Sequence, residues 1–214
     1  MLTIISGGPD IQIGDLKERI LSSDRIIAAD SGADYLYAWG IVADEVVGDM
    51  DSVDRKALEW HRSKGAQIRL FPPEKDMTDL ELCLDENSRE EIFCILSLSG
   101  RPDHSMGHLM LLAQKAAAGQ NLTATDGRTW IFPLKGPCEF VFPQEQQCTG
   151  SVISLFPILG PVKNVCTHGL YYPLADATLL PGSTRSISNC VADGATRPGL
   201  TIGEGVLLVM LVPD

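Results

Sequence analysis

The chain has 214 residues, of which 44% are hydrophobic and 21% are charged, and its formal net charge is -11 at pH 7. This length and composition are typical of a folded protein with one or two domains and exclude a largely disordered chain. The acidic excess argues against a nucleic-acid partner, because nucleic-acid binding depends on clusters of Lys and Arg. A polyanionic small substrate would therefore need metal ions to offset the charge.

The N-terminal residues, MLTIISGGPD, lack the basic region and long apolar run that mark a secretory signal. No apolar segment approaches the roughly 18 residues that a membrane-spanning helix needs. We therefore expect a cytoplasmic protein with no membrane partner. The six cysteines show no C-x-x-C spacing, so they predict neither a zinc site nor a redox pair.

The first 128 residues alternate short apolar runs with longer amphipathic segments, which is the pattern of a parallel sheet flanked by helices. Strands are expected at residues 2–5, 25–29, 45–47, 67–70, 92–96 and 122–124, and helices at residues 15–21, 54–64, 79–87 and 104–118. Most of these helices follow a strand and a polar turn. In such sheets, ligands bind beyond the carboxyl ends of the strands, where the strand-to-helix loops converge.

From about residue 129 the pattern changes to short β-prone runs separated by Pro and Gly turns. Strands are expected at residues 129–132, 139–142, 151–156 and 205–211, and no helix is expected. This pattern predicts a small antiparallel β-sandwich domain over residues 129–214. The expected fold is therefore an α/β N-terminal domain with a mostly parallel sheet, at residues 1–128, followed by the β domain.

Four acidic or polar segments fall at the ends of expected strands: DSGAD at 30–34, GDMDS at 48–52, DMTD at 76–79 and GRPDH at 100–104. Asp49 and Asp51 are two residues apart, so in a near-extended turn their carboxylates face the same side. With Asp79 they can share one or two hard cations such as Mg²⁺. Alternatively, each aspartate caps the helix that follows it. Four clusters at one edge favour the cation site, because excess carboxylate is costly without one.

Basic side chains and glycines fall at the same expected edge. Arg101 and Lys75 can hold phosphate oxygens, Arg through its bidentate fork and Lys as a point charge. Alternatively, both are exposed surface residues with no part in the site. Gly7, Gly8 and Gly32 follow the first two strands and let the backbone approach a nucleotide closely. Neither a Walker loop nor a G-x-G-x-x-G motif accompanies them.

In order and approximate spacing, the segments DSGA (30–33), GDMDS (48–52), KDMTD (75–79) and GRPDH (100–104) resemble the motifs of the thiamine pyrophosphokinase catalytic domain. The resemblance implies that Asp49, Asp51 and Asp79 surround Mg²⁺ and phosphates, that Asp30 lies near the nucleotide or the metal, and that Arg101 with Asp103 closes the site. The expected catalytic group is Asp49, Asp51, Asp79, Arg101 and Asp103. The resemblance also implies an ATP site formed by Asp30, Ser31, Gly32, Lys75, Thr78, Arg101 and His104.

The β half contains a second polar segment of interest. Tyr172 offers a flat face for an aromatic or cationic ring, and Ser188 and Asn189 offer hydrogen bonds to ring nitrogens. Alternatively, Tyr172 packs in the core of the β domain, and Ser188 and Asn189 belong to a solvated turn. The segments GLYY (169–172) and SISN (186–189) look like the thiamine-binding domain of the same family, although Tyr172 falls where many members place Trp. The resemblance implies thiamine contacts from Tyr172, Ser186, Ser188 and Asn189.

The resemblance implies an enzyme that transfers the diphosphate group of Mg-ATP to the hydroxyl of thiamine and releases AMP. We expect one aspartate, Asp79 or Asp103, to accept the proton of that hydroxyl. The family also implies a homodimer with active sites between subunits. Two alternatives are a pterin diphosphokinase built on a similar acidic domain, and a non-catalytic sensor of Mg-nucleotide or thiamine.

Overall fold

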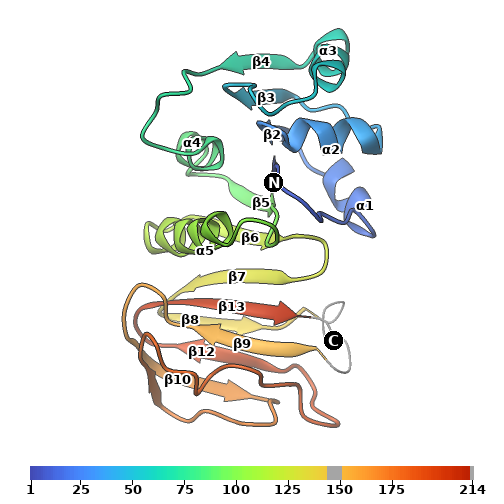
Figure 1. Ribbon diagram of the computed structural model, residues 1–214. Helices are drawn as coiled ribbons and strands as arrows, with labels where there is room; N and C mark the ends of the chain where they lie inside the picture. The colour runs from blue at the N-terminus through green and yellow to red at the C-terminus, as the bar shows by residue number, and fades with distance from the viewer. Residues whose placement is uncertain (144–150, 213–214) are drawn as a thin grey trace. The chain divides into compact units, whose positions relative to one another are not determined.

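The computed structural model describes residues 1–143 and 151–212 of the chain (Figure 1). Its internal contacts divide the chain into two compact units. The first contains residues 1–106 and 120–127, and the second contains residues 107–119 and 128–214.

The first unit is built on six parallel strands in the order β4-β3-β2-β1-β5-β6. Their bounds are β1 (Leu2–Ser6), β2 (Arg25–Ala29), β3 (Glu45–Gly48), β4 (Gln67–Leu70), β5 (Glu91–Ile95) and β6 (Asn121–Thr125). β1 and β2 are buried along almost their whole length, as is typical of parallel strands covered on both faces. Every strand expected in this half is present.

Helices cover both faces of this sheet, with α1, α2 and α3 on one side and α4 on the other (Figure 1). Their bounds are α1 (Leu16–Leu21), α2 (Gly32–Trp39), α3 (Arg55–Ser63) and α4 (Asp79–Glu86). The longest helix, α5 (Pro102–Ala117), begins in the first unit and continues in the second. Among the described residues, no helix has both the length and the hydrophobicity needed to cross a membrane.

The sequence analysis missed α2, a helix of only 8 residues that starts at a glycine. Helices shorter than about 12 residues are marginal alone, so their own sequence signal is weak. In the fold, α2 is stabilised by packing, because Ala33 and Leu36 are fully buried. The segment expected to be a ligand loop is therefore partly the first turn of a helix.

The second unit contains two antiparallel sheets that share one core. β13 (Val206–Val212) pairs with β7 (Trp130–Lys135) and β9 (Val152–Phe156), and the other sheet has the order β11-β10-β12-β8. The strands of that sheet are β8 (Cys138–Val141), β10 (Val162–His168), β11 (Ala177–Leu179) and β12 (Gly199–Ile202). Buried residues from both sheets, including Leu155, Val165, Leu200 and Val209, form a single cluster. The expected fold class is confirmed.

Three strands of the second unit, β10, β11 and β12, were not expected. The register of β10 against β11 shifts between Val162 and Val165, and Asn164 has a φ of 53°. Such an irregularity interrupts the alternation of apolar and polar residues by which a strand is recognised. β11 has only 3 residues, too few for any periodic signal.

His61 connects three segments of the first unit. Its ring in α3 is fully buried, and Nδ1 accepts a hydrogen bond from the backbone N of Ala43 at 3.2 Å. Nε2 therefore carries the proton and donates to the carbonyl of Ala33 at 3.0 Å. This arrangement requires a neutral ring, and burial lowers the pKa of His61.

We expect the free energy of unfolding to fall as the pH drops below about 6.5, the ordinary histidine pKa. Because the folded pKa of His61 is lowered, the unfolded state binds more protons in this range, and stability is lost as the pH falls toward the folded pKa. Thermal melts between about pH 7.5 and pH 5.5 test this for the wild type and His61→Gln. Glutamine can accept and donate a hydrogen bond but does not titrate, so His61→Gln should lose less stability than the wild type over this pH range. Equal losses in the two proteins would show that His61 is not the titrating group.

Candidate active site

The loops at the carboxyl ends of β1, β2 and β5 are packed closely together. The chain order reverses beside β1, which has β2 on one side and β5 on the other, and open α/β sheets bind ligands at such a point. Ser97 Oγ donates to the carbonyl of Pro9 at 2.5 Å, which joins the loops after β5 and β1. A Cβ at Gly7 would lie 1.9 Å from Ser31 Oγ and 2.9 Å from Ser31 Cβ, so the β1 loop passes very close to the start of α2 and a side chain here would displace Ser31.

Ser31 and Gly32 form the start of α2. The side chain of Ser31 makes no capping hydrogen bond. A Cβ at Gly32 would lie 2.0 Å from the carbonyl oxygen of Ile5, so the first turn of α2 packs directly against the end of β1. Backbone N–H groups at such a helix start can receive an anion, which is compatible with the nucleotide role expected for both residues.

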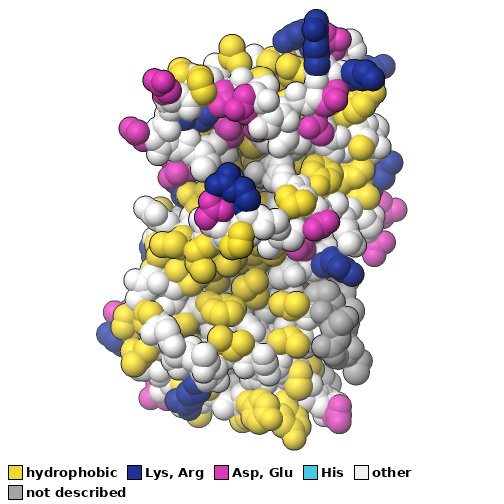
Figure 2. Space-filling view, viewed as in Figure 1, with side chains coloured by type: hydrophobic (Ala, Val, Ile, Leu, Met, Phe, Trp, Pro, Cys, Tyr) yellow, Lys and Arg dark blue, Asp and Glu magenta, His cyan; other side chains and the backbone are white. Residues whose placement is uncertain are grey.

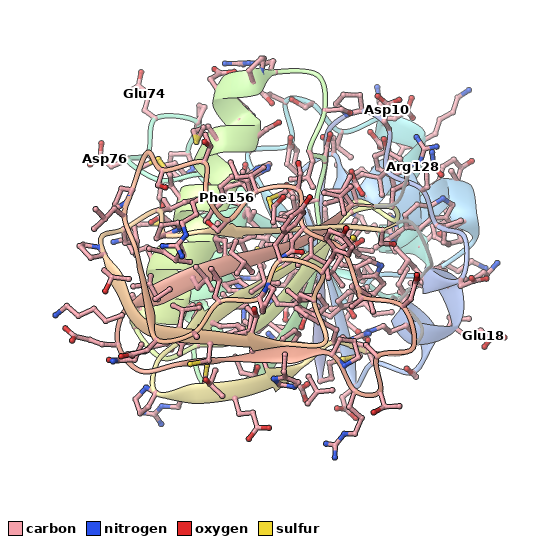
Figure 3. The ribbon with its side chains drawn as sticks, turned by 90° about the horizontal axis from the view of Figure 1, so that it is seen from below. Asp10, Glu18, Glu74, Asp76, Arg128 and Phe156 are labelled. Carbon is pink, nitrogen blue, oxygen red and sulfur yellow. The ribbon has the colours of Figure 1, made fainter. Side chains whose placement is uncertain are left out.

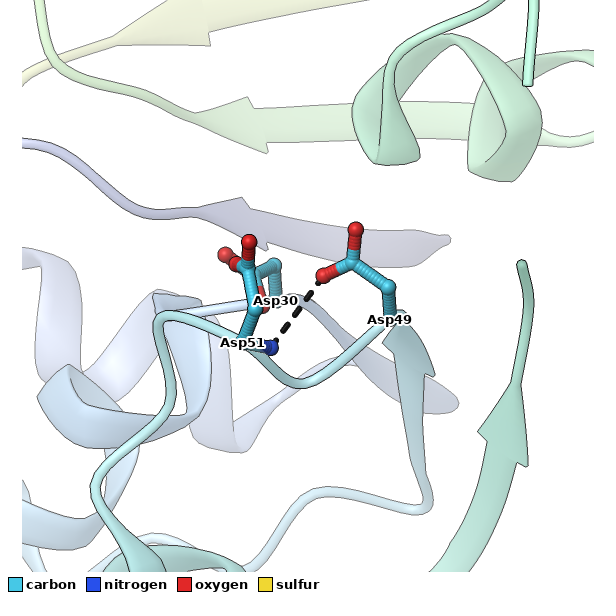
Figure 4. A group of neighbouring side chains, drawn as sticks. All are labelled: Asp30, Asp49 and Asp51. Atoms are coloured by element: carbon cyan, nitrogen blue, oxygen red, sulfur yellow. Dashed lines mark hydrogen bonds between the residues drawn. The ribbon is translucent and has the colours of Figure 1, made fainter. Parts of the chain in front are cut away.

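Asp30, Asp49 and Asp51 form a cluster of carboxylates (Figure 4). Asp30 follows β2 and the other two follow β3, and one oxygen of each lies within 4.8 Å of the others. The backbone N of Asp51 donates to Asp49 Oδ1 at 3.2 Å across a turn in which Met50 has a φ of 65°. This turn points both side chains to the same side, as the two-residue spacing predicted (Figure 4).

Gly48 allows these carboxylates to approach one another. Its φ is 154°, and a Cβ at this position would lie 3.2 Å from the Cβ of Asp30 and 3.3 Å from the Cγ of Asp79. A side chain at this position would therefore require the end of β2 or the start of α4 to shift slightly. Asp79, the first residue of α4, is thus held beside the cluster.

Asp30 has the least favourable environment of the cluster. Its Oδ1 is buried and has no hydrogen-bond partner among the described residues. Burial raises the pKa of Asp30, and the charges of Asp79, Asp49 and Asp51 raise it further, against a hydrogen bond from the backbone of Ser31. Burying a carboxylate oxygen without a partner is costly. The oxygen-only donor set and this orphaned atom fit a hard divalent cation such as Mg²⁺.

Lys75 faces the cluster from the loop before α4. Its Nζ lies 3.1 Å from Asp79 Oδ1 and 3.8 Å from Asp49 Oδ2, and its side chain is only 16% exposed. The neighbouring Glu74 and Asp76 are exposed and point outward (Figure 3). The metal set expected from the sequence contained Asp79, whereas the structure pairs Asp79 with Lys75 and places Asp30 with Asp49 and Asp51.

Helix capping, the alternative role for the aspartates, falls to other residues. Asp54 accepts from the backbone N of Lys56 at 2.7 Å and caps α3. Thr78 Oγ1 accepts from the backbone N of Glu81 at 3.2 Å and caps α4. The Thr78 hydroxyl, which was expected to contact the nucleotide, therefore already makes a hydrogen bond within the fold. Asp49 and Asp51 therefore remain available for a ligand.

Asp34 anchors the loop that carries Asp49 and Asp51. Its Oδ1 accepts from the backbone N of Asp54 at 3.0 Å, which ties the end of the loop to α2. The start of the loop is fixed to the same region, because the backbone N of Asp30 donates to the carbonyl of Val47 at 2.8 Å. The sequence analysis missed this role, since nothing in the sequence shows which amide Asp34 meets.

Arg101 and Asp103 pair with each other at the start of α5. Arg101 Nη2 lies 2.5 Å from Asp103 Oδ2, and the two side chains are 70% and 62% exposed. The guanidinium lowers the pKa of Asp103 to about 2. Neither side chain makes a hydrogen bond or ion pair with the aspartate cluster in the described part of the chain. His104, in the first turn of α5, is also exposed.

The second unit contains a pocket of about 250 Å³. Its lining residues are Leu155, Tyr172, Pro173, Leu174, Arg185, Ser186 and Asn189. Hydrophobic side chains reach the surface of this unit (Figure 2), and Tyr172, which is 64% exposed, is one of them. Its ring meets that of Tyr171 edge to face, with centroids 4.8 Å apart. Tyr172 thus offers an accessible aromatic face, as expected.

The polar residues expected to bind a ring are used differently in this pocket. Asn189 Oδ1 accepts from the backbone N of Tyr172 at 3.0 Å, and Nδ2 donates to the carbonyl of Tyr172 at 2.7 Å. Ser186 Oγ donates to the carbonyl of Leu155 at 2.7 Å. Ser188 is exposed at a φ of 62° and does not line the pocket. The sequence analysis did not single out Arg185, although its charge within a polar segment was a usable signal.

Both halves of the chain match models of known families. A model described as "Thiamin pyrophosphokinase, catalytic domain" matches residues 16–124, and one described as "Thiamin pyrophosphokinase, vitamin B1 binding domain" matches residues 138–206. The first match alone spans about half of the chain and includes the whole aspartate cluster. The second includes the pocket.

Individual proteins agree with these matches. Thiamine pyrophosphokinase from Bacillus subtilis is 27% identical over 218 residues, an alignment that covers 100% of this chain and 99% of that one. Its crystal structure matches with a TM-score of 0.83 at 25% identity, covering 100% of this chain and 99% of the other. The structure of the protein from Geobacillus thermodenitrificans, at 24% identity and with 100% and 97% covered, shares the fold with a TM-score of 0.80. The chain belongs to the thiamin pyrophosphokinase family.

Proposed function

We propose that the protein transfers the diphosphate group of Mg-ATP to the hydroxyl of thiamine, forming thiamine diphosphate and AMP. The observation that carries this proposal is the cluster of Asp30, Asp49 and Asp51 at the carboxyl edge of the sheet, in which the buried Asp30 Oδ1 has no hydrogen-bond partner in the described part of the chain. Transfer of a charged phosphate group depends mainly on alignment and charge neutralisation. A carboxylate cluster that can hold a divalent cation is suited to that task.

The residues that would hold Mg²⁺ are Asp30, Asp49 and Asp51, with Asp79 beside them. When bound, Mg²⁺ supplies neutralisation of the phosphate charge and a fixed orientation of the phosphate oxygens. Lys75, placed between Asp49 and Asp79, would contribute a positive charge at the same edge. Arg101 is exposed enough to reach an ATP phosphate oxygen through its guanidinium fork.

In the reaction, the thiamine hydroxyl oxygen bonds to the β-phosphorus of ATP while the bond from that phosphorus to the α,β-bridging oxygen breaks. AMP leaves with the bridging oxygen, and the hydroxyl proton passes to a carboxylate. Asp103 is a weak base for this step, because Arg101 lowers its pKa to about 2. We therefore assign the proton to Asp79, which lies beside the cluster.

The pocket of the second unit is our proposed thiamine site, with the ring of Tyr172 against the aminopyrimidine. Aromatic pairs of this kind contribute roughly 0.5–1.5 kcal/mol beyond the area they bury. Ser186 and Asn189 shape the pocket through their bonds to Leu155 and Tyr172. A homodimer with active sites between subunits and a cytoplasmic location complete the proposal, both on the basis of the family resemblance.

The direct test is incubation of the purified chain with Mg-ATP and thiamine, followed by separation of nucleotides and thiamine esters. We expect AMP and thiamine diphosphate in equal amounts, because one transfer produces one of each. A 6-hydroxymethyl pterin offered in place of thiamine should yield no AMP. AMP formation with the pterin alone, or none with thiamine, would contradict the proposal.

Removing one charge from the cluster should weaken the cation site. Asp51→Asn is expected to lower kcat/KM at limiting Mg²⁺ by at least about 100-fold. Mutation of a residue that only orients a metal ligand already lowers metal affinity or activity by about 10- to 100-fold, and Asp51 is proposed to be a ligand itself. The matched control is Asp15→Asn, which removes the same charge from an exposed residue before α1. Near-normal activity of folded Asp51→Asn, with Mg²⁺ titrated over the same range, would remove Asp51 from the site.

The anchoring role of Asp34 can be separated from its charge. Asp34→Ala frees the end of the loop that carries Asp49 and Asp51, so the Mg²⁺ concentration for half-maximal activity should rise by about 3- to 10-fold, as expected for one lost hydrogen bond. Asp34→Asn keeps an oxygen that can accept from the backbone N of Asp54 and should restore the wild-type value. If Asn fails to rescue while both variants melt like the wild type, anchoring is not the role of Asp34.

A further inference from the structure

Arg185 is the charged residue in the lining of the second unit's pocket. Its side chain is exposed and forms no hydrogen bond or ion pair with the described residues. Arginine presents five N–H donors in a planar fork and no acceptor. A free guanidinium at the wall of a pocket is therefore available to a ligand.

The other polar side chains of the pocket are largely occupied. Asn189 Oδ1 accepts from the backbone N of Tyr172 and, at 2.9 Å, from the backbone N of Cys190. One of the two Nδ2 hydrogens of Asn189 is used on the carbonyl of Tyr172, and the hydroxyl hydrogen of Ser186 is used on the carbonyl of Leu155. The strongest free polar group in the pocket is thus a donor, and the remaining wall is apolar or aromatic.

We propose that Arg185 donates a hydrogen bond to a pyrimidine ring nitrogen of thiamine and so determines which end of the acceptor enters the pocket. This inference rests on the proposed function. The aminopyrimidine has two ring nitrogens with lone pairs and a flat face for Tyr172, so it matches both the donor and the ring. Arg185 takes the role that the sequence analysis assigned to Ser188 and Asn189.

The charge of Arg185 favours the same orientation. Thiamine carries a positive charge on its thiazolium ring, and like charges close together repel. The neutral aminopyrimidine therefore occupies the pocket next to the guanidinium, and the thiazolium with its hydroxyethyl arm extends away from it. Because Arg185 is exposed, water and salt screen the repulsion that remains at that longer distance.

The test begins with Arg185→Met, which keeps an unbranched side chain and removes the donors. We expect the KM for thiamine to rise by about 10-fold, because hydrogen bonds from charged donors are the stronger kind, with kcat and the KM for ATP unchanged. Arg185→Lys keeps a charged donor and should regain part of the loss. The matched control, Arg62→Met, removes an exposed arginine of α3 and should leave all three constants unchanged.

Thiamine analogues identify the bond itself. In two analogues, N1′ or N3′ of the pyrimidine is replaced by CH, and each is measured as a competitive inhibitor of the wild type and of Arg185→Met. With one of the two, both proteins should give the same inhibition constant, because the acceptor of Arg185 is gone. The proposal would be overturned by an unchanged thiamine KM in Arg185→Met. It would also be overturned if the substitution weakened the binding of thiamine and of both analogues by the same factor. A wild type that makes no thiamine diphosphate would instead overturn the proposed function.

Discussion

Repulsion among carboxylates at the carboxyl edge of the parallel sheet is the constraint on which the site depends. Asp30, Asp49 and Asp51 approach within a few ångströms, and Asp79 lies next to them. Burial of Asp30 makes this arrangement more costly, because a charge in a poorly solvated position interacts more strongly with its neighbours. Lys75 offsets part of the charge, and a bound cation would offset the rest. Under the proposed function, this excess of negative charge favours a nucleotide that arrives with Mg²⁺ over a free anion.

The backbone around this cluster is itself in uncommon conformations. Asp30 and Met50 have φ values of 49° and 65°, in the left-handed region that residues with a Cβ seldom adopt. Such conformations persist where the surrounding structure determines them, and they are concentrated at functional sites. Here the buried strands β2 and β3 fix one side of the cluster, and the bond from the backbone N of Asp54 to Asp34 fixes the other. The backbone that carries the carboxylates is thus held by contacts within the fold.

The two units use their polar side chains differently. In the first, Asp30 Oδ1 is buried without a hydrogen-bond partner among the described residues, and Lys75 lies between Asp49 and Asp79. In the second, Asn189 and Ser186 are buried and bonded to backbone groups, so their polar atoms stabilise the pocket wall. The pocket keeps an aromatic face at Tyr172 and, at Arg185, a guanidinium that pairs with none of the described residues. A ring with an apolar face and a polar edge meets both requirements.

The fold class, and the edge of the sheet at which the acidic motifs lie, could be predicted from the sequence alone. Buried parallel strands must be apolar almost throughout, and the acidic motifs follow those strands directly, so both were visible in the order of residues. The grouping of Asp30 with Asp49 and Asp51, with Asp79 paired to Lys75 beside them, is visible in the folded chain and not in the sequence, because it depends on how the ends of β2 and β3 and the start of α4 pack around Gly48. The folded chain likewise shows Asn189 bonded to Tyr172, whereas the Arg185 side chain pairs with none of the described residues. Hydrogen bonds between residues distant in the sequence exist only once the chain has folded, so no local pattern reveals which polar side chains they occupy.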